Sequence, residues 1–204
     1  MAQNAPKVLC SYEMSPSESK WITLKKIKYV DEDGIERVWE SAERRTRKAT
    51  GVDAVAIFAV IRSKTNAFPV STVVIEQYRP PIGKYNFNHL SGLIDEGETA
   101  QQAALRELHE ETGFMAHKVL QVSPVVVSDP GMTNANMQLV VLAVDLEDKM
   151  IKPEPKLDPG EHIVARVVEL TKLVTELKDY DTKGFVIDAR LSHLASGMEL
   201  VQQL

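Results

Sequence analysis

Short apolar segments of strand length recur through the middle of the chain. Five of them are rich in β-branched residues and are predicted as strands, at residues 53–62, 72–78, 119–127, 138–145 and 163–169. Nearer the start, strand-like segments at 21–30 and 36–45 flank Asp31-Glu32-Asp33-Gly34, and such a short link with a glycine suits an antiparallel hairpin. The pattern predicts a sheet in the body of the chain and a separate β unit before it.

Helical periodicity appears in three segments. Residues 99–112 predict a strong helix, which Thr99 begins with a capping-box pattern and Gly113 is placed to end. Leucines at helical spacings predict two more helices, at 171–179 and 185–203. Together the elements predict an α+β fold, with a mixed sheet flanked by helices and an N-terminal antiparallel β unit.

The length of 204 residues fits one compact domain with an appendage. The N-terminal hairpin is too small and too rich in aromatic residues to stand alone. We therefore expect it to pack on the rest of the chain or on a second subunit. A soft boundary is expected near residue 50.

The composition is that of an ordinary soluble protein, with 44% apolar and 26% charged residues. A formal net charge of −5 argues against a large surface for nucleic acid or anionic membranes, but leaves room for a small anionic ligand. The only cysteine, Cys10, cannot pair within the chain, which favours a reducing compartment. The N-terminal segment lacks the roughly 20 apolar residues of a membrane helix. We expect a cytoplasmic or nuclear protein without nucleic-acid or membrane partners.

Three glutamates gather on one side of the predicted helix 99–112. Glu107, Glu110 and Glu111 are three and four residues apart, so their carboxylates repel one another unless a cation lies among them. Oxygen ligands point to Mg²⁺ or Mn²⁺, and magnesium typically takes one or two protein carboxylates together with substrate phosphate oxygens. Arg106 can hold Glu110 across one turn. Taken alone, such a cluster is more often a charged helix face in water.

The wider sequence favours the metal site. The pattern GX5EX7REUXEEXGU, in which U is an apolar residue, is matched at every specified position by Gly92, Glu98, Arg106, Glu107, Leu108, Glu110, Glu111, Gly113 and Phe114. Gly92 and Gly97 are expected to allow tight turns that let a loop carbonyl approach the same metal. In its loop-to-helix context, the pattern resembles the Nudix hydrolase family. This resemblance implies an α/β/α-like Nudix fold and metal-dependent hydrolysis of a nucleoside diphosphate derivative.

Similarity to the eukaryotic ADP-ribose pyrophosphatases of this family extends over roughly residues 18–195. It is carried by Lys20-Trp21, Trp39-Glu40-Ser41 through Arg47-Lys48, and residues 77–81, 128–131 and 159–161. The resemblance implies Mg²⁺-dependent hydrolysis of ADP-ribose, or a related nucleoside diphosphate sugar, to AMP and ribose 5-phosphate, with Mn²⁺ as a substitute. It also implies a homodimer that exchanges residues 1–50, a dimerising and adenine-binding β unit, while residues 51–204 form the Nudix catalytic domain.

The same resemblance assigns roles to single residues. Metal ligation falls to Glu107, Glu111 and the backbone carbonyl of Ser91, with Glu110 and Arg106 supporting them. Glu161 is expected to deprotonate or orient the attacking water. Substrate contacts are implied at Trp21, Trp39, Glu40, Arg44, Arg79, Leu93 and Asp129.

Several of these residues also have plainer explanations. Trp21 and Trp39 could sandwich an adenine, or form a hydrophobic dimer seam. Arg44 and Arg79 could bind phosphate oxygens with guanidinium forks, or keep the surface soluble. Glu161 could be an ordinary solvated loop residue, and Asp129 could form a turn with Pro130.

One segment departs from the family pattern. Before Gly92, relatives typically carry Glu-Phe-Pro-Ala, whereas this chain has Asn88-His89-Leu90-Ser91. The missing carboxylate and proline are expected to remove charge and stiffness beside the metal site, and to alter metal affinity, substrate preference or rate. Two alternatives therefore stay open. The substrate could be another nucleoside diphosphate derivative, such as an oxidised guanine nucleotide, or the chain could be a catalytically weak module that binds ADP-ribose.

Overall fold

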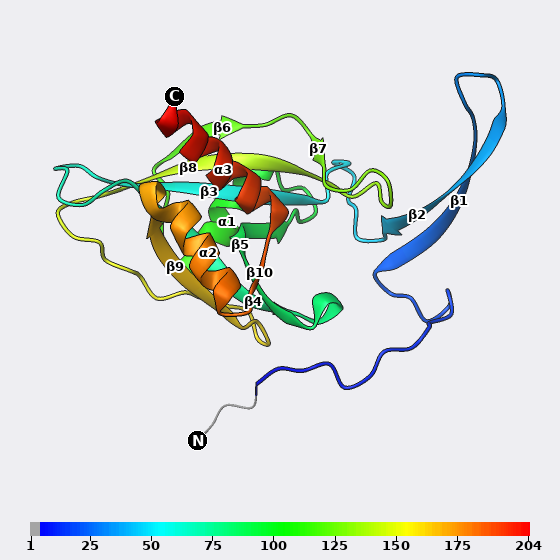
Figure 1. Ribbon diagram of the computed structural model, residues 1–204, viewed down its shortest axis with the longest axis horizontal. Coiled ribbons are helices and arrows are strands. Elements are labelled where there is room, and N and C mark those ends of the chain that lie inside the picture. Colours follow the sequence, from blue (N-terminus) through cyan, green and yellow to red (C-terminus); the bar gives the residue numbers. More distant parts are fainter. Residues whose placement is uncertain (1–4) are drawn as a thin grey trace.

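The fold is an eight-stranded mixed sheet preceded by a separate hairpin, and the computed structural model describes residues 5–204 (Figure 1). Residues 1–4 of the predicted N-terminal unit lie outside the described residues. The strands of the sheet are β3 (Ala54–Ser63), β4 (Ser71–Arg79), β5 (Lys84–Leu93), β6 (Lys118–Val122), β7 (Val126–Val127), β8 (Asn136–Leu146), β9 (Ile163–Glu169) and β10 (Val186–Ile187). Their order is β10-β5-β4-β3-β8-β6, with β7 on β8 and β9 on β4. Because β3–β8 and β5–β10 pair in parallel and β4–β5 antiparallel, the predicted mixed sheet is confirmed.

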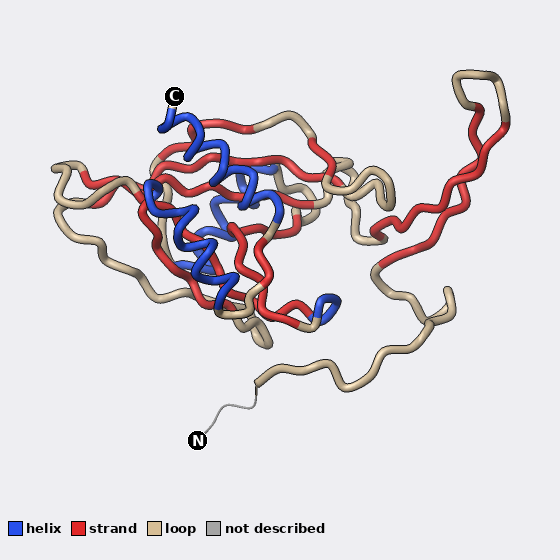
Figure 2. Tube along the Cα trace, in the orientation of Figure 1, coloured by secondary structure: helices blue, strands red, loops and turns tan. Residues whose placement is uncertain are grey.

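Helices cover both faces of this sheet (Figure 2). The helical elements are α1 (Ala100–Thr112), α2 (Leu173–Thr182), α3 (Ala189–Gln203) and two short 3-10 turns, η1 (Pro80–Ile82) and η2 (Leu170–Lys172). A hydrophobic core lies on each face of the sheet, and alternate residues of β4 point into one or the other. Val73 and Ile75 belong to the core that contains Leu108 of α1, whereas Val74 belongs to the core that contains Leu191 of α3. In the part of the chain that the structure describes, no helix has the length and apolarity to cross a membrane.

The ends of α1 are set by local chemistry, as the sequence predicts. Thr99 is the N-cap, and its side chain accepts a hydrogen bond from the Gln102 backbone while the Gln102 side chain accepts one from Thr99 N–H at 2.8 Å. Gly113 ends the helix with a φ of 73°, and its N–H donates to His109 O at 2.8 Å. The capping-box and glycine predictions are confirmed.

Two predicted boundaries are wrong. The segment 119–127 is not one strand, because Ser123 and Pro124 separate β6 from β7, and proline has no N–H for a sheet. The last helix begins at 189 rather than 185, because Val186–Ile187 pair with β5 as β10. Asp188 then caps α3 by accepting hydrogen bonds from the two backbone N–H groups that follow Ala189.

The apolar pattern predicts no strand at residues 84–93, where the structure has β5. Its residues include polar side chains that break the apolar pattern, such as Asn86, Asn88 and His89, yet all three are buried. Tertiary pairing explains this, because β5 pairs with β4, β3 and β10 and thereby lies inside the sheet.

The N-terminal β unit is a two-stranded antiparallel sheet, β1 (Ile22–Val30) and β2 (Glu36–Arg44), as predicted. It projects away from the body of the molecule (Figure 1). The Trp39 indole donates to Gly131 O at 2.8 Å, and Ala42 N–H donates to Met132 O at 2.9 Å. The hairpin leaves large apolar side chains in solvent, above all Trp21 at 70% and Leu24 at 74% exposed. It is therefore anchored near one end and carries exposed apolar side chains among its charged ones.

Candidate active site

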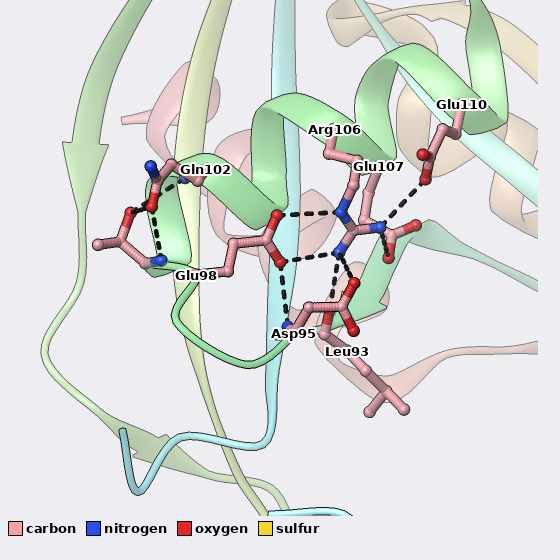
Figure 3. Close-up of polar contacts among 8 residues, drawn as sticks. Leu93, Asp95, Glu98, Gln102, Arg106, Glu107 and Glu110 are labelled. Carbon is pink, nitrogen blue, oxygen red and sulfur yellow. Dashed lines mark hydrogen bonds and ion pairs between the residues drawn. The ribbon is translucent and has the colours of Figure 1, made fainter. Parts of the chain in front are cut away.

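Arg106 organises the acidic face of α1 (Figure 3). Its Nε and Nη2 form a bidentate pair with Glu98 at 3.0 Å each, and Nη1 donates to Glu107 at 2.9 Å and Glu110 at 3.0 Å. Nη2 also donates to Leu93 O at 3.0 Å. The hydrogen bonds that Arg106 donates to these carboxylates, chiefly to Glu98, raise its pKa. The predicted hold on Glu110 is confirmed, and the same guanidinium ties the helix to the loop before it.

Gly92 does not form the predicted tight turn. It lies inside β5 and has no positive φ, whereas Gly97 does adopt a turn with a φ of 78°. A Cβ at Gly92 would overlap the carboxylate of Glu107. The missing side chain therefore makes room for a glutamate of α1 to lie against β5.

Glu111 is the most deeply placed of the acidic residues. It is 5% exposed, and its Oε2 has no hydrogen-bond partner among the described residues. Burial raises its pKa to about 8, with the charges of Glu107 and Glu161 adding to the effect. Burial also raises the pKa of Glu107, against the opposing effect of Arg106. The alternative of a charged helix face in water therefore does not hold for Glu111, because this residue is buried.

A cavity of about 460 Å³ is lined in part by Gly92, the residue against which Glu107 lies. Its wall also contains three arginines, namely Arg44 of β2, Arg79 of β4 and Arg190 of α3, whereas no glutamate lines it. The side chains of Arg44 and Arg79 make no hydrogen bond or ion pair with any residue in the described range 5–204. Partial burial lowers the pKa of Arg79; the charges of the other two arginines lower it further, and the charge of Glu111 acts in the opposite direction. The cavity thus holds arginines without ion-pair partners, and the buried Glu111 is near enough for its charge to act on one of them.

Comparison with known proteins now bears on this arrangement. A model of the NUDIX domain matches residues 52–188. The chain belongs to the Nudix family. It is 40% identical to an uncharacterized Nudix hydrolase of Schizosaccharomyces pombe, with 95% of this chain and 93% of that protein covered.

Two further relatives are named for an activity. An ADP-ribose pyrophosphatase of Saccharomyces cerevisiae is 40% identical, with 92% of this chain and 80% of that protein covered. An ADP-sugar pyrophosphatase of Mus musculus is 36% identical, with 84% and 78% covered. A crystal structure of an ADP compounds hydrolase matches with a TM-score of 0.62 at 22% identity, covering 100% of this chain and 95% of that one. This last likeness bears on the fold alone.

Nudix hydrolases generally need a divalent metal, and the residues present fit one. Within residues 5–204, no three His, Cys, Asp or Glu side chains form a ready-made metal cage. However, the half-buried Glu107 and the buried Glu111 repel each other, and Glu111 Oε2 has no hydrogen-bond partner among the described residues. A hard cation would relieve both conditions, and two carboxylates completed by substrate oxygens are enough for such an ion.

The structure brings some of the predicted Nudix site residues together. Arg44, Arg79, Ser91 and Leu93 line the cavity. Glu161, on the loop before β9, lies close enough for its charge to raise the pKa of both Glu107 and Glu111. The loop glutamate predicted from the sequence therefore belongs to the same acidic group.

Four predicted substrate contacts do not line the cavity in this chain: Trp21, Trp39, Glu40 and Asp129. The two indoles are also far from each other, because Trp39 pairs with Ile27 while Trp21 precedes Ile22. Six residues of extended strand correspond to a separation of about 20 Å. A sandwich of one adenine by both tryptophans would therefore need a second copy of the chain.

Sequence reasoning missed several residues of the cavity wall, namely Asn86, Met137, Asp188 and Arg190. The only signal was the position of Asp188 before a helix, which predicts a cap but not a site. Leu90, at which relatives typically carry proline, is fully buried and pairs with Ile57 of β3. The expected effect of the missing proline on stiffness stays a prediction.

Proposed function

We propose that this Nudix protein hydrolyses the pyrophosphate bond of ADP-ribose, or of a related nucleoside diphosphate sugar, to AMP and ribose 5-phosphate. The names of the yeast and mouse relatives support this substrate class. The observation that carries the proposal is that arginines without ion pairs and a buried glutamate with an unpartnered oxygen lie close together. Among the described residues, Arg44 and Arg79 of the cavity wall form no ion pair, and Glu111 Oε2 has no hydrogen-bond partner. A diphosphate with a bound divalent ion would satisfy both.

Mg²⁺ is the proposed metal, with Mn²⁺ as a substitute, and Glu107, Glu111 and the carbonyl of Ser91 would hold it. When bound, such a metal neutralises charge on the diphosphate as water attacks. Arg106 orients Glu107 by its 2.9 Å hydrogen bond and so fixes a ligand before substrate arrives.

The remaining groups act on the substrate and the water. Arg44 and Arg79 would bind phosphate oxygens, and Leu93 would contact the substrate at the cavity mouth. Glu161 would accept a proton from the attacking water or orient it, since it lies near Glu107 and Glu111.

The experiment is a substrate panel with Mg²⁺, read by product chromatography in ¹⁸O-labelled water. ADP-ribose should give AMP and ribose 5-phosphate with a higher kcat/KM than other nucleoside diphosphate sugars or an oxidised guanine nucleoside diphosphate. A clear preference for the guanine nucleotide would replace the substrate and keep the chemistry. The label shows which phosphorus is attacked.

A catalytically weak module that binds ADP-ribose is the second candidate. The replacement of a typical glutamate by Asn88 beside the metal site favours it. Tight binding of ADP-ribose without release of AMP in the presence of Mg²⁺ would decide for the binding module.

We also propose a homodimer in which residues 1–50 carry the adenine-binding and dimerising β unit and residues 51–204 the catalytic domain. The exposed apolar side chains of β1 and β2, and the separation of the two indoles, support a second copy. Glu40 and Asp129 would then complete the site around the nucleoside. Trp39→Ala should weaken nucleotide binding, and an unchanged KM together with an unchanged sedimentation coefficient would contradict this.

The proposed location is the cytoplasm, with the nucleus as the alternative, because the single unpaired Cys10 suits a reducing compartment. Imaging of a tagged chain in living cells tests this.

A further inference from the structure

Asn88 of β5 is a buried amide for which the described residues offer no hydrogen bond. It is 2% exposed, and its Oδ1 has no hydrogen-bond partner among the described residues. It nevertheless lines the cavity beside the acidic group. Since buried polar groups are nearly always hydrogen-bonded, an unpartnered amide at a cavity wall indicates that the missing partner comes from a ligand.

Arg190 lines the same cavity and is held in a fixed orientation. Its Nε and Nη2 bind the two carboxylate oxygens of Asp188 at 3.0 and 2.7 Å. Asp188 is itself fixed, because it accepts hydrogen bonds from the backbone of the first turn of α3. The Nη1 of Arg190 contacts only the sulfur of Met137, at 3.1 Å, and so has no oxygen acceptor. This arginine therefore keeps donor capacity for a ligand.

Asn88 and Arg190 differ in net charge from the other two arginines of the cavity wall. Arg44 and Arg79 have no carboxylate partner, so they suit the charged phosphates. Arg190, in contrast, is neutralised by Asp188, and Asn88 carries no charge. A second anion would meet the carboxylate of Asp188, whereas a neutral hydroxyl group could donate to Asn88 and accept from Arg190.

We propose that Asn88 and Arg190 form a subsite for hydroxyl groups, which takes the sugar attached to the distal phosphate and so selects nucleoside diphosphates that carry a sugar there. The subsite rests on the proposed function. In the proposed homodimer the indoles hold the base, and neither Trp21 nor Trp39 of this chain lines the cavity. We therefore assign the diphosphate and the group beyond it to the cavity.

Asn88→Leu removes both polar atoms and keeps the branching of the side chain. Because the Asn88 amide makes no hydrogen bond with any described residue, the melting temperature should stay the same or rise. Affinity is measured by calorimetry in EDTA, with ADP-ribose and with ADP, which lacks the distal sugar. The variant should bind ADP-ribose about 10-fold more weakly and ADP within about 2-fold of the wild type.

Arg190→Lys is the second variant, because it keeps the charge that neutralises Asp188 while removing the fixed fork. It should shift the ratio of the two affinities in the same direction. Thr72→Val is the matched control, since it removes another buried, unpartnered polar atom in β4 away from the cavity. This control should leave both affinities unchanged.

Equal weakening of both ligands in Asn88→Leu and Arg190→Lys would overturn the subsite, as would a lowered melting temperature with an unchanged affinity ratio. The proposed function fails separately, if the wild type with Mg²⁺ releases no AMP from ADP-ribose. A selective loss of ADP-ribose affinity in both variants would support the subsite whatever the turnover.

Discussion

The acidic face of α1 and the cavity lined by Arg79 and Asn88 differ in how their polar groups are satisfied. On α1, Arg106 is held by three carboxylates and one carbonyl. In the cavity, the side chains of Arg79 and Asn88 have no hydrogen-bond partner among the described residues. Glu111 is buried, one of its oxygens has no partner in the same range, and the charges of both Glu107 and Arg79 act on its pKa. Groups that are paired position their neighbours, whereas groups left unpaired await a ligand.

The unpaired groups lower the stability of the folded chain, and the paired groups hold them in place. A buried polar group without a partner destabilises the folded chain by about 1–3 kcal/mol, so an unused one is rarely retained. The paired groups around Arg106 provide the rigidity that keeps the unpaired groups in place. Substitutions of the unpaired groups should therefore alter activity more than stability, and substitutions of the paired groups should alter both.

The largest effect is expected for Glu111→Gln. Removing the charge of a proposed metal ligand should lower kcat by about 10³-fold, or about 4 kcal/mol of barrier, while the fold persists. Steady-state kinetics with Mg²⁺ and a melting curve provide the two readings. Glu199→Gln, an exposed glutamate of α3, is the matched control and should keep full activity. Turnover near that of the wild type would remove Glu111 from the mechanism.

The pH dependence of stability without metal comes next. The folded protein keeps a proton on Glu111 up to a pKa of about 8, whereas its ordinary value is 4.5. In EDTA, stability from this group is therefore present below pH 4.5 and is lost as the pH rises through this window. We expect a loss of about 2–3 kcal/mol between pH 5 and 8 in denaturant titrations.

Two comparisons isolate the contribution of Glu111. The unfolding free energy of Glu111→Gln should not show this loss between pH 5 and 8, so the difference in unfolding free energy between the variant and the wild type is plotted against pH. Addition of Mg²⁺ should restore the stability of the wild type at pH 8. Parallel pH curves for the variant and the wild type would contradict the raised pKa.

Gly92→Ala tests the close approach of α1 to β5. An added Cβ would overlap the Glu107 carboxylate, so this glutamate must move. We expect kcat/KM to fall about 10- to 100-fold, with a smaller change in melting temperature. Gly197→Ala in α3 meets no atom and should be stabilising by about 0.5–1 kcal/mol with full activity. Equal behaviour of the two variants would show that Glu107 tolerates displacement.

The smallest effect is expected for Arg106→Lys. The change keeps the charge but loses the fork that binds Glu98, Glu107 and Glu110 together. Turnover should fall about 10-fold and unfolding free energy by about 1–2 kcal/mol. Arg62→Lys, in a surface pair with Asp145, should change stability by less than about 0.5 kcal/mol. If stability falls while turnover holds, Arg106 serves the fold alone.

Much of the fold was predictable where local chemistry decides it. Thr99 and Gly113 set the ends of α1, and β9 begins and ends as the apolar pattern indicates. Prediction failed at β5, because its polar side chains hide a strand whose pairing depends on residues far along the chain. The same separation in sequence hid Arg190, which reaches the cavity only because α3 packs beside β5.

The sequence by itself determined the acidic helix, its caps, the spacing of Glu107, Glu110 and Glu111, and hence membership of the Nudix family, because these depend on neighbours within one or two turns. Only the tertiary structure decided which of these groups are buried, which are paired and what faces them. Burial and pairing depend on contacts between segments distant in sequence, and these contacts change a carboxylate from a solvated charge into a site for a cation.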